Sequence, residues 1–197
     1  MNKLTVIIAL IICLLCFGCK TISKTNIIVD SNDASRSINT IAVMHFNDQL
    51  LPKKGVTGTL VKTISTANAG EMLASIMSRE LSGLGIYEVL SRTDIAKIIN
   101  KSKVNEKELV ERRDYDRLGK LLGVDSVVIG KILEFKLSSS VIYERGTVSF
   151  VAECIDTKNG KVLWTIEAKE SAAYEDEIEL AGKAMRTAIE KLKKELR

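Results

Sequence analysis

Cys19 is the residue whose surroundings point most directly to a chemical reaction. Gly18 precedes it, and the chain before Gly18 carries Lys3 and an apolar run over residues 4–15. A basic start, a short apolar stretch and a small residue before the cut are the anatomy of a secretory signal peptide. The run is shorter than the roughly 20 apolar residues that a membrane-spanning helix needs. We therefore predict cleavage between Gly18 and Cys19.

A cysteine directly after the cut resembles the bacterial lipoprotein signal, in which the thiol receives a diacylglycerol. This resemblance implies a palmitate-type lipid anchor on Cys19. Two neighbours depart from the usual pattern, because Cys16 stands where leucine is expected and Phe17 is bulky. The alternative is an ordinary secreted protein with a chance cysteine. Lys20, instead of aspartate, is compatible with outer-membrane sorting under the rule known for some bacteria.

The remaining cysteines agree with an exported chain that carries a single modified thiol. Cys13 and Cys16 leave with the signal, so Cys154 is the one other thiol of the mature protein. An intramolecular disulfide is then impossible once Cys19 is acylated. Cys154 stands in an alternating, strand-like run. We therefore favour a buried structural cysteine over a reactive one.

Other residue patterns that could carry chemistry are weak. His45 is the one histidine and ends an apolar run, which favours a hydrogen-bonded structural role over a catalytic base. Without a second histidine or a Cys-x-x-Cys pair, a His/Cys metal site is not expected. The GVTGT segment at residues 55–59 lacks the lysine of a phosphate loop. The acidic run at residues 175–177 fits a helix start better than a calcium site. We expect no cofactor, no metal and no enzymatic activity.

Composition bounds the class of protein. The net charge is +4, and the 27% of charged residues are interspersed in sign, which argues against a nucleic-acid surface. Weak attraction to an anionic membrane surface stays open. No small-molecule substrate is evident. Residues 19–197 suffice for one domain with a real core.

Hydrophobic periodicity predicts an α/β domain over residues 40–197, after a signal peptide at 1–18 and a polar, flexible tether at 19–39. The predicted order is β-α-β-α-α-β-β-β-α. Strands are expected at 40–46, 86–90, 124–135, 147–156 and 161–166, and helices at 67–84, 91–102, 106–122 and 175–196. Helices connect the early strands, which can therefore pair in parallel, and the last three strands form a meander. The result is a mixed β-sheet with helices packed on it.

Two segments are candidate contact surfaces. Residues 47–66 form a long connection that holds Pro52, Gly55 and Gly58, and a loop of this length is usually functional or mobile. The helix predicted at 106–122 carries a highly charged outer face, which is more typical of a solvated surface than of a site. Both proposals come from position alone.

Four motifs resemble one family of periplasmic domains. They are IAVMHF at 41–46, YEVLSRTDI at 87–95, LGKLLGVDSVVIG at 118–130 and DTKNGKVLW at 156–164. In this order, and behind a lipoprotein signal, they are similar to the CsgG, LpoB and TolB-N-like domains. The closest fit is the CsgG-type domain, over nearly all of residues 40–170.

The resemblance implies two functions of different classes. CsgG is an outer-membrane channel for curli secretion, and LpoB-type lipoproteins activate a peptidoglycan synthase, a penicillin-binding protein. A full channel needs membrane strands of about 9–11 alternating residues. Residues 137–145 offer only a short polar turn in place of the first membrane hairpin. The final helix follows the last strand almost directly, where the second hairpin would lie. We therefore expect a non-catalytic, lipid-anchored periplasmic protein that acts in envelope assembly or secretion, by protein binding or by forming a homo-oligomer. The alternative is an LpoB-like activator.

The anchor gives the first testable prediction. Cys19→Ala removes the acylated thiol, so the protein should move from the membrane fraction to the soluble fraction of fractionated cells. A single acyl chain holds a protein weakly at a membrane, whereas several acyl chains on one cysteine anchor it stably. Unchanged membrane retention of the variant would contradict the anchor.

Overall fold

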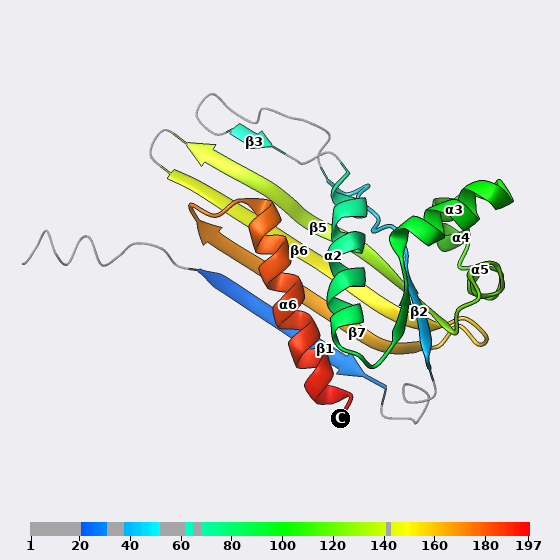
Figure 1. Ribbon diagram of the computed structural model, residues 1–197. Coiled ribbons are helices and arrows are strands. Elements are labelled where there is room, and N and C mark those ends of the chain that lie inside the picture. The colour runs from blue at the N-terminus through cyan, green and yellow to red at the C-terminus, as the bar shows by residue number, and fades with distance from the viewer. Residues whose placement is uncertain (1–20, 31–37, 52–61, 65–67, 141–142) are drawn as a thin grey trace, which may run out of the picture.

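The computed structural model describes residues 21–30, 38–51, 62–64, 68–140 and 143–197. These residues form a seven-stranded mixed sheet in the order β1-β7-β6-β5-β2-β4, with β3 pairing β5 off this path (Figure 1). The elements are β1 (Ile22–Val29), β2 (Thr40–Val43), β3 (Lys62–Ile64), α2 (Ala69–Gly83), β4 (Glu88–Leu90), α3 (Arg92–Ser102), α4 (Glu106–Glu111), α5 (Tyr115–Leu122), β5 (Ser126–Ser140), β6 (Tyr143–Asp156), β7 (Val162–Ala173) and α6 (Glu177–Glu195). The mixed α/β fold predicted from the sequence is confirmed.

The first half of the domain is parallel and covered on both faces. β2 pairs in parallel with β4 on one side and with β5 on the other. Helix α2 connects β2 to β4, and the helices α3 to α5 connect β4 to β5. Two separate apolar clusters form, one beneath α2 and one beneath α3 to α5. This double cover explains why β2 is an apolar run without alternation.

The second half is an antiparallel meander of long strands. β5, β6 and β7 pair in sequence, and β1 closes the sheet against β7. Helix α6 lies across these strands, beside α2 on the same face (Figure 1). The opposite face carries charged residues such as Glu134 and Lys169, which pair at 2.6 Å. This half therefore alternates between apolar and polar positions, as a sheet covered on one face does.

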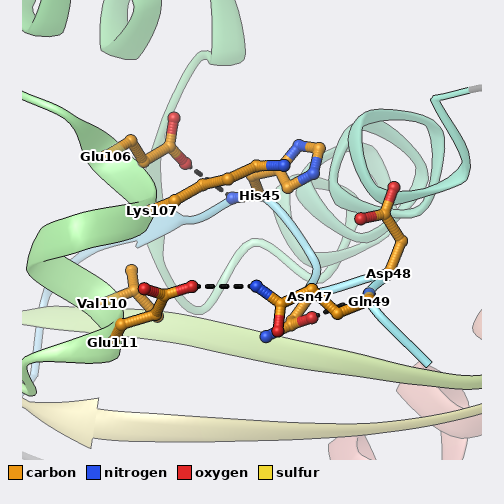
Figure 2. A pocket seen from close by; sticks show the side chains of 8 residues that line it. All are labelled: His45, Asn47, Asp48, Gln49, Glu106, Lys107, Val110 and Glu111. Carbon is orange, nitrogen blue, oxygen red and sulfur yellow. Dashed lines mark hydrogen bonds between the residues drawn. The ribbon is translucent and has the colours of Figure 1, made fainter.

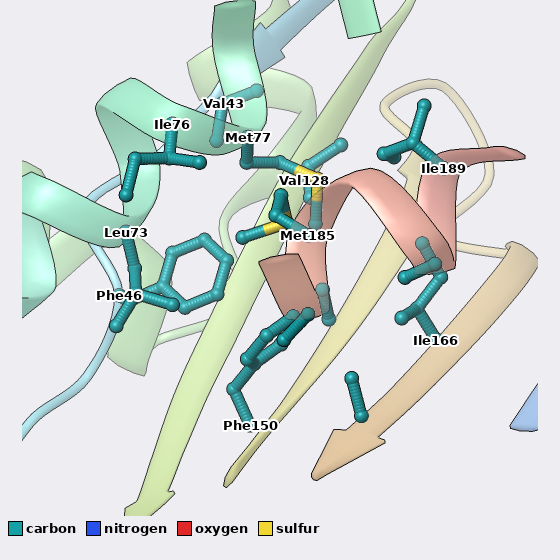
Figure 3. Packing of buried hydrophobic residues seen from close by; sticks show 14 of the residues in the cluster. Val43, Phe46, Leu73, Ile76, Met77, Val128, Phe150, Ile166, Met185 and Ile189 are labelled. Carbon is teal, nitrogen blue, oxygen red and sulfur yellow. The ribbon is translucent and has the colours of Figure 1, made fainter. Parts of the chain in front are cut away.

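The core joins the two halves. Figure 3 shows Phe46, which follows β2, and Phe150 of β6 packed together with Met77 of α2 and Met185 of α6. The two phenyl rings meet edge to face, with centroids 6.0 Å apart. Cys154 is fully buried in the same cluster, and burial raises the pKa of its thiol to about 12. The prediction of an inert, structural cysteine is thus confirmed.

The tether predicted for residues 19–39 is wrong over Ile22–Val29, which form β1. The strand pairs with β7 over its whole length, from Ile22 opposite Ser171 to Val29 opposite Trp164. Only a few of its side chains, including Ile27 and Val29, pack against the core. The β-branched residues of this segment, Ile22, Thr25, Ile27, Ile28 and Val29, were a strand signal that its polar neighbours outweighed in the sequence.

Three further predictions need correction. The turn predicted at 137–145 is largely strand, because β5 continues to Ser140 and β6 begins at Tyr143. β7 continues to Ala173 instead of ending near residue 166. The helix predicted at 106–122 divides into α4 and α5, with Arg113 at a φ of 57° between them. The added part of β7 contributes Ala168 and Ala172 to the core, and α4 and α5 bury Leu109 and Leu118 in the second cluster.

Two more observations complete the fold. The short strand β3 lies within the connection predicted at 47–66, of which residues 52–61 and 65–67 are outside the described part. Among the residues that the structure describes, no helix is both long and apolar enough to cross a membrane.

Gly130 gives a prediction for the core. A Cβ at this position of β5 would lie 2.3 Å from the ring of Phe46, which is fully buried and cannot move aside. Gly130→Ala should therefore lower the free energy of unfolding by about 1–3 kcal/mol, measured by denaturant titration.

Gly83→Ala is the matched control for this substitution. It meets nothing within 4 Å at the end of α2 and should be neutral or stabilise by up to about 1 kcal/mol. Equal effects of the two substitutions would contradict the packing around Phe46.

Candidate functional site

The best-formed polar site lies at the carboxyl end of β2. His45 follows this strand, Glu71 stands in the first turn of α2, and Arg92 and Glu106 are the first residues of α3 and α4. β2 lies between two parallel neighbours, and the chain leaves it first toward β4 and later returns to β5. In open α/β sheets, such a reversal leaves a crevice outside the carboxyl ends of the strands, where ligands commonly bind.

Arg92 organises this site. Its Nε donates to Glu71 Oε1 at 3.0 Å and its Nη2 to Glu71 Oε2 at 2.6 Å, a bidentate pair. Its Nη1 donates to Glu106 Oε1 at 3.2 Å and to the carbonyl oxygen of Val43 at 2.8 Å. The side chain is only 12% exposed. One guanidinium therefore ties the starts of three helices to the end of β2.

The charges of the site stabilise one another. Burial alone would raise the pKa of Glu71, but the hydrogen bond and the charge of Arg92 outweigh it and lower the pKa below its ordinary value of 4.5. Burial likewise opposes the charge on Arg92, yet Glu71 and Glu106 raise the pKa of the guanidinium. Both groups stay charged near neutral pH, and their hydrogen bonds are directed at one another.

His45 is held tightly and has little room for chemistry. Its backbone nitrogen donates to Glu106 Oε1 at 2.6 Å, and its Nδ1 lies 3.6 Å from Glu71 Oε2. The Nε2 atom is buried without a hydrogen-bond partner in the described protein. A Cβ at residue 70 would come within 2.4 Å of Nε2, so only glycine fits there. The ring lies at the end of β2, beside the carboxylate of Glu71.

A small pocket opens beside this network, between the segment after β2 and helix α4. We call it the β2–α4 pocket. Its walls include Asn47 and Asp48 on one side and Lys107, Val110 and Glu111 on the other (Figure 2). Gln49 Nε2 donates to Glu111 Oε1 at 3.0 Å across the pocket's edge. The start of the connection at 47–66 therefore meets the first turns of the predicted charged helix, which brings the two candidate contact surfaces together.

The pocket's size limits what it can do. Its cavity holds about 30 Å³, room for one or two water molecules. Small-molecule sites usually enclose about 300–1,000 Å³. In the part of the chain that the structure describes, no group of three or more His, Cys, Asp or Glu side chains is arranged to hold a metal ion. What the arrangement offers is a small polar depression with an acidic rim.

The remaining predicted residues fall into two groups. Gly18 and Cys19 lie outside the described residues, so the anchor stays a prediction. The helix start predicted at residues 175–177 is confirmed, because Asp176 caps α6 and accepts hydrogen bonds from the backbone nitrogens of Ile178 and Glu179. Ser91 caps the start of α3, because its hydroxyl accepts a hydrogen bond from the backbone nitrogen of Asp94.

Sequence reasoning missed the role of Arg92. The residue belongs to the motif at 87–95 and directly follows a predicted strand and the first residue of the next predicted helix. That position was the one signal in the sequence for a role at the strand end. Its partners lie 21 and 14 positions away in the chain. Only the fold shows that these separate helix starts converge.

These features define a mixed α/β domain with a polar site around Arg92 at the carboxyl end of β2. Residues 52–197 match the family described as "Putative lipoprotein GNA1162-like", and the chain belongs to this family. No curated protein matches the sequence significantly.

Solved structures show the same fold at low sequence identity. The lipoprotein GNA1162 from Neisseria meningitidis is 17% identical with a TM-score of 0.58, over 78% of this chain and 97% of that one. The PelC dodecamer from Paraburkholderia phytofirmans is 14% identical with a TM-score of 0.56, over 87% of this chain and 98% of that one. At these identities, the likeness establishes the fold alone.

The Arg92 network generates a stability prediction. Arg92→Ala leaves Glu71, Glu106 and the Val43 carbonyl without their shared donor, so the free energy of unfolding at pH 7 should fall by about 2 kcal/mol. Because the pKa of Glu71 is lowered in the folded state, its stabilisation is present above pH 4.5 and is lost as the pH falls through the folded pKa. Arg92→Ala should flatten this acid dependence in denaturant titrations.

The control for this substitution is Arg112→Ala, which removes an exposed pair with Glu108 on α4. It should change stability by less than about 0.5 kcal/mol and leave the acid dependence intact. An equal loss in both variants would contradict the structural role of Arg92.

Proposed function

We propose that this protein is a non-catalytic lipoprotein, anchored through Cys19 on the periplasmic side of the outer membrane, that works by binding other proteins. The observation that carries the proposal is that the charged groups of the polar site are paired with one another. Arg92 is saturated by Glu71, Glu106 and a backbone carbonyl, and the cavity beside it holds about 30 Å³. A site of this kind stabilises a scaffold and leaves no room for a substrate. Membership in a family of lipoproteins supports the anchor.

The β2–α4 pocket is the proposed contact surface for a partner. Asp48, Glu106 and Glu111 place three carboxylates around it, against the single cation of Lys107. At the rim of this pocket, the charged end of a partner's lysine or arginine would find complementary charge beside the apolar side chain of Val110. The network around Arg92 keeps this surface rigid, which lowers the entropy cost of binding.

Self-association is the second part of the proposal. The PelC structure with the same fold is a dodecamer. In this chain, the uncovered face of the antiparallel strands bears the exposed apolar residues Ile28 (58%) and Leu133 (43%). Such residues favour contact with another subunit over permanent exposure to water. An assembly of copies would serve envelope assembly or secretion.

The experiment is crosslinking in intact cells from a photoreactive residue at position 111, followed by mass spectrometry of the partner. The matched control places the same residue at position 190, on the exposed surface of α6. A secretion component or a second copy would support the proposal, whereas a peptidoglycan synthase would favour the LpoB-like alternative. Turnover of a small molecule by the purified full chain would overturn the non-catalytic assignment.

Charge reversal at the pocket gives the corresponding prediction. Glu111→Lys should weaken partner binding about tenfold, because a like charge then faces the partner's cation at a cost of about 1.4 kcal/mol. Glu190→Lys changes the total charge equally and should leave binding unchanged. The measurement is the affinity of the purified partner by calorimetry, and equal affinities for the two variants would contradict the pocket as contact surface.

A further inference from the structure

The lipid anchor and the folded sheet are separated by very little chain. β1 begins at Ile22, three residues after Cys19. Three residues span at most about 11 Å in any conformation. The segment between the lipid on Cys19 and the sheet is therefore too short to be a long flexible linker. The end of the sheet that holds Ile22 must lie close to the bilayer.

The strand register identifies which end of the sheet this is. Ile22 lies opposite Ser171 of β7, and Ser171 lies opposite Thr147 of β6. From Thr147, β6 extends four more residues in the same direction to its first residue, Tyr143. Four strand residues span about 13 Å. The tip of the β5–β6 pair therefore reaches about as far beyond Ile22 as Cys19 can.

The side chains at this end suit a membrane interface. We call Tyr143, Arg145, Tyr174 and Ile178 the sheet-end patch. Tyr174 follows β7 and is 69% exposed, Ile178 in the first turn of α6 is 49% exposed, and Tyr143 is 37% exposed. The two tyrosine rings meet edge to face at 6.1 Å, and the Arg145 guanidinium lies 5.4 Å from the centroid of the Tyr143 ring. Tyrosine combines an apolar ring with a polar tip and is enriched where a bilayer meets water.

The charges around the patch are of both signs. Glu144, Glu175, Asp176 and Glu179 are acidic neighbours, and Arg145 and Lys183 are cations beside them. Lys24 follows Ile22 by two residues and Lys136 of β5 lies opposite Thr147, so further cations stand at the same end. The patch would therefore enter the interface through its aromatic and apolar side chains, and its charge favours neither anionic nor zwitterionic headgroups.

We propose that the sheet-end patch sits in the interfacial layer of the bilayer that holds the Cys19 lipid, and that it fixes the orientation of the domain on the membrane. This inference rests on the proposed anchor. The acyl chains hold the protein at the bilayer, and the patch adds a second point of contact. Two points of attachment restrict rotation of the domain, which one acylated residue alone would permit.

Fluorescence quenching in vesicles tests the proposal with the lipidated full chain. Trp164, the one tryptophan, is buried in the core and gives the same background in every variant. A second tryptophan is introduced as Tyr174→Trp or, independently, as Ile178→Trp. The control is Lys158→Trp in the exposed turn between β6 and β7, at the opposite end of the sheet.

In phosphatidylcholine vesicles with brominated acyl chains, the added emission of both patch variants should fall by about half, because interfacial side chains lie about 5–10 Å into the boundary layer. The emission added by Lys158→Trp should not change. Replacing half of the lipid by phosphatidylglycerol should leave the quenching unchanged. Quenching that appears only on anionic lipid would overturn docking through the aromatic and apolar side chains.

Two outcomes separate this inference from the anchor on which it rests. Patch variants that float with the vesicles but are not quenched would overturn the docking and leave the anchor intact. Failure of the lipidated chain to float would overturn both. An emission change that follows protein concentration, and not bromination, would assign the patch to contact with a second copy and also overturn the docking.

Discussion

The pairing of β1 with β7 is the constraint on which the account of this protein depends. Eight residues of β1 follow the register from Ile22 opposite Ser171 to Val29 opposite Trp164. Ser23 adds a side-chain hydrogen bond to Glu170, which is buried in β7. Because the strand begins three residues after the predicted anchor, this pairing turns a polar leader into a rigid part of the sheet. It determines how far the domain can stand from the membrane.

The two halves of the sheet then have separate tasks. The parallel half gathers the starts of α2, α3 and α4 around Arg92 and holds the β2–α4 pocket rigid. The antiparallel half carries the long strands that end at the sheet-end patch. Asn47 beside the pocket forms a β-bridge with Lys131 of β5. Lys131 lies nine residues before Ser140, the last residue of that strand. The pocket would thus stand up to about 30 Å above a bilayer at the patch, open to a periplasmic partner.

Much of the fold could be predicted from the sequence, and the exceptions share a cause. The buried strand β2, the capped start of α3 and the final helix α6 carry strong apolar periodicity or caps. β1, β3 and the outer parts of β5 to β7 mix polar and apolar residues, and their pairing with neighbouring strands is visible only in the fold. Arg92 was visible as a motif residue, but its partners Glu71 and Glu106 reach it only because the starts of α2, α3 and α4 converge in the fold.

Hydrogen exchange on the membrane-bound full chain tests the central claim most directly. The amides of Ile22–Val29 should be protected as strongly as those of their partners in β7, since both belong to one ladder. Protection of this kind would mean that the anchor is joined to a rigid sheet edge. Exchange of these amides within the shortest labelling time, with β7 still protected, would contradict the account and restore a flexible tether over residues 19–39.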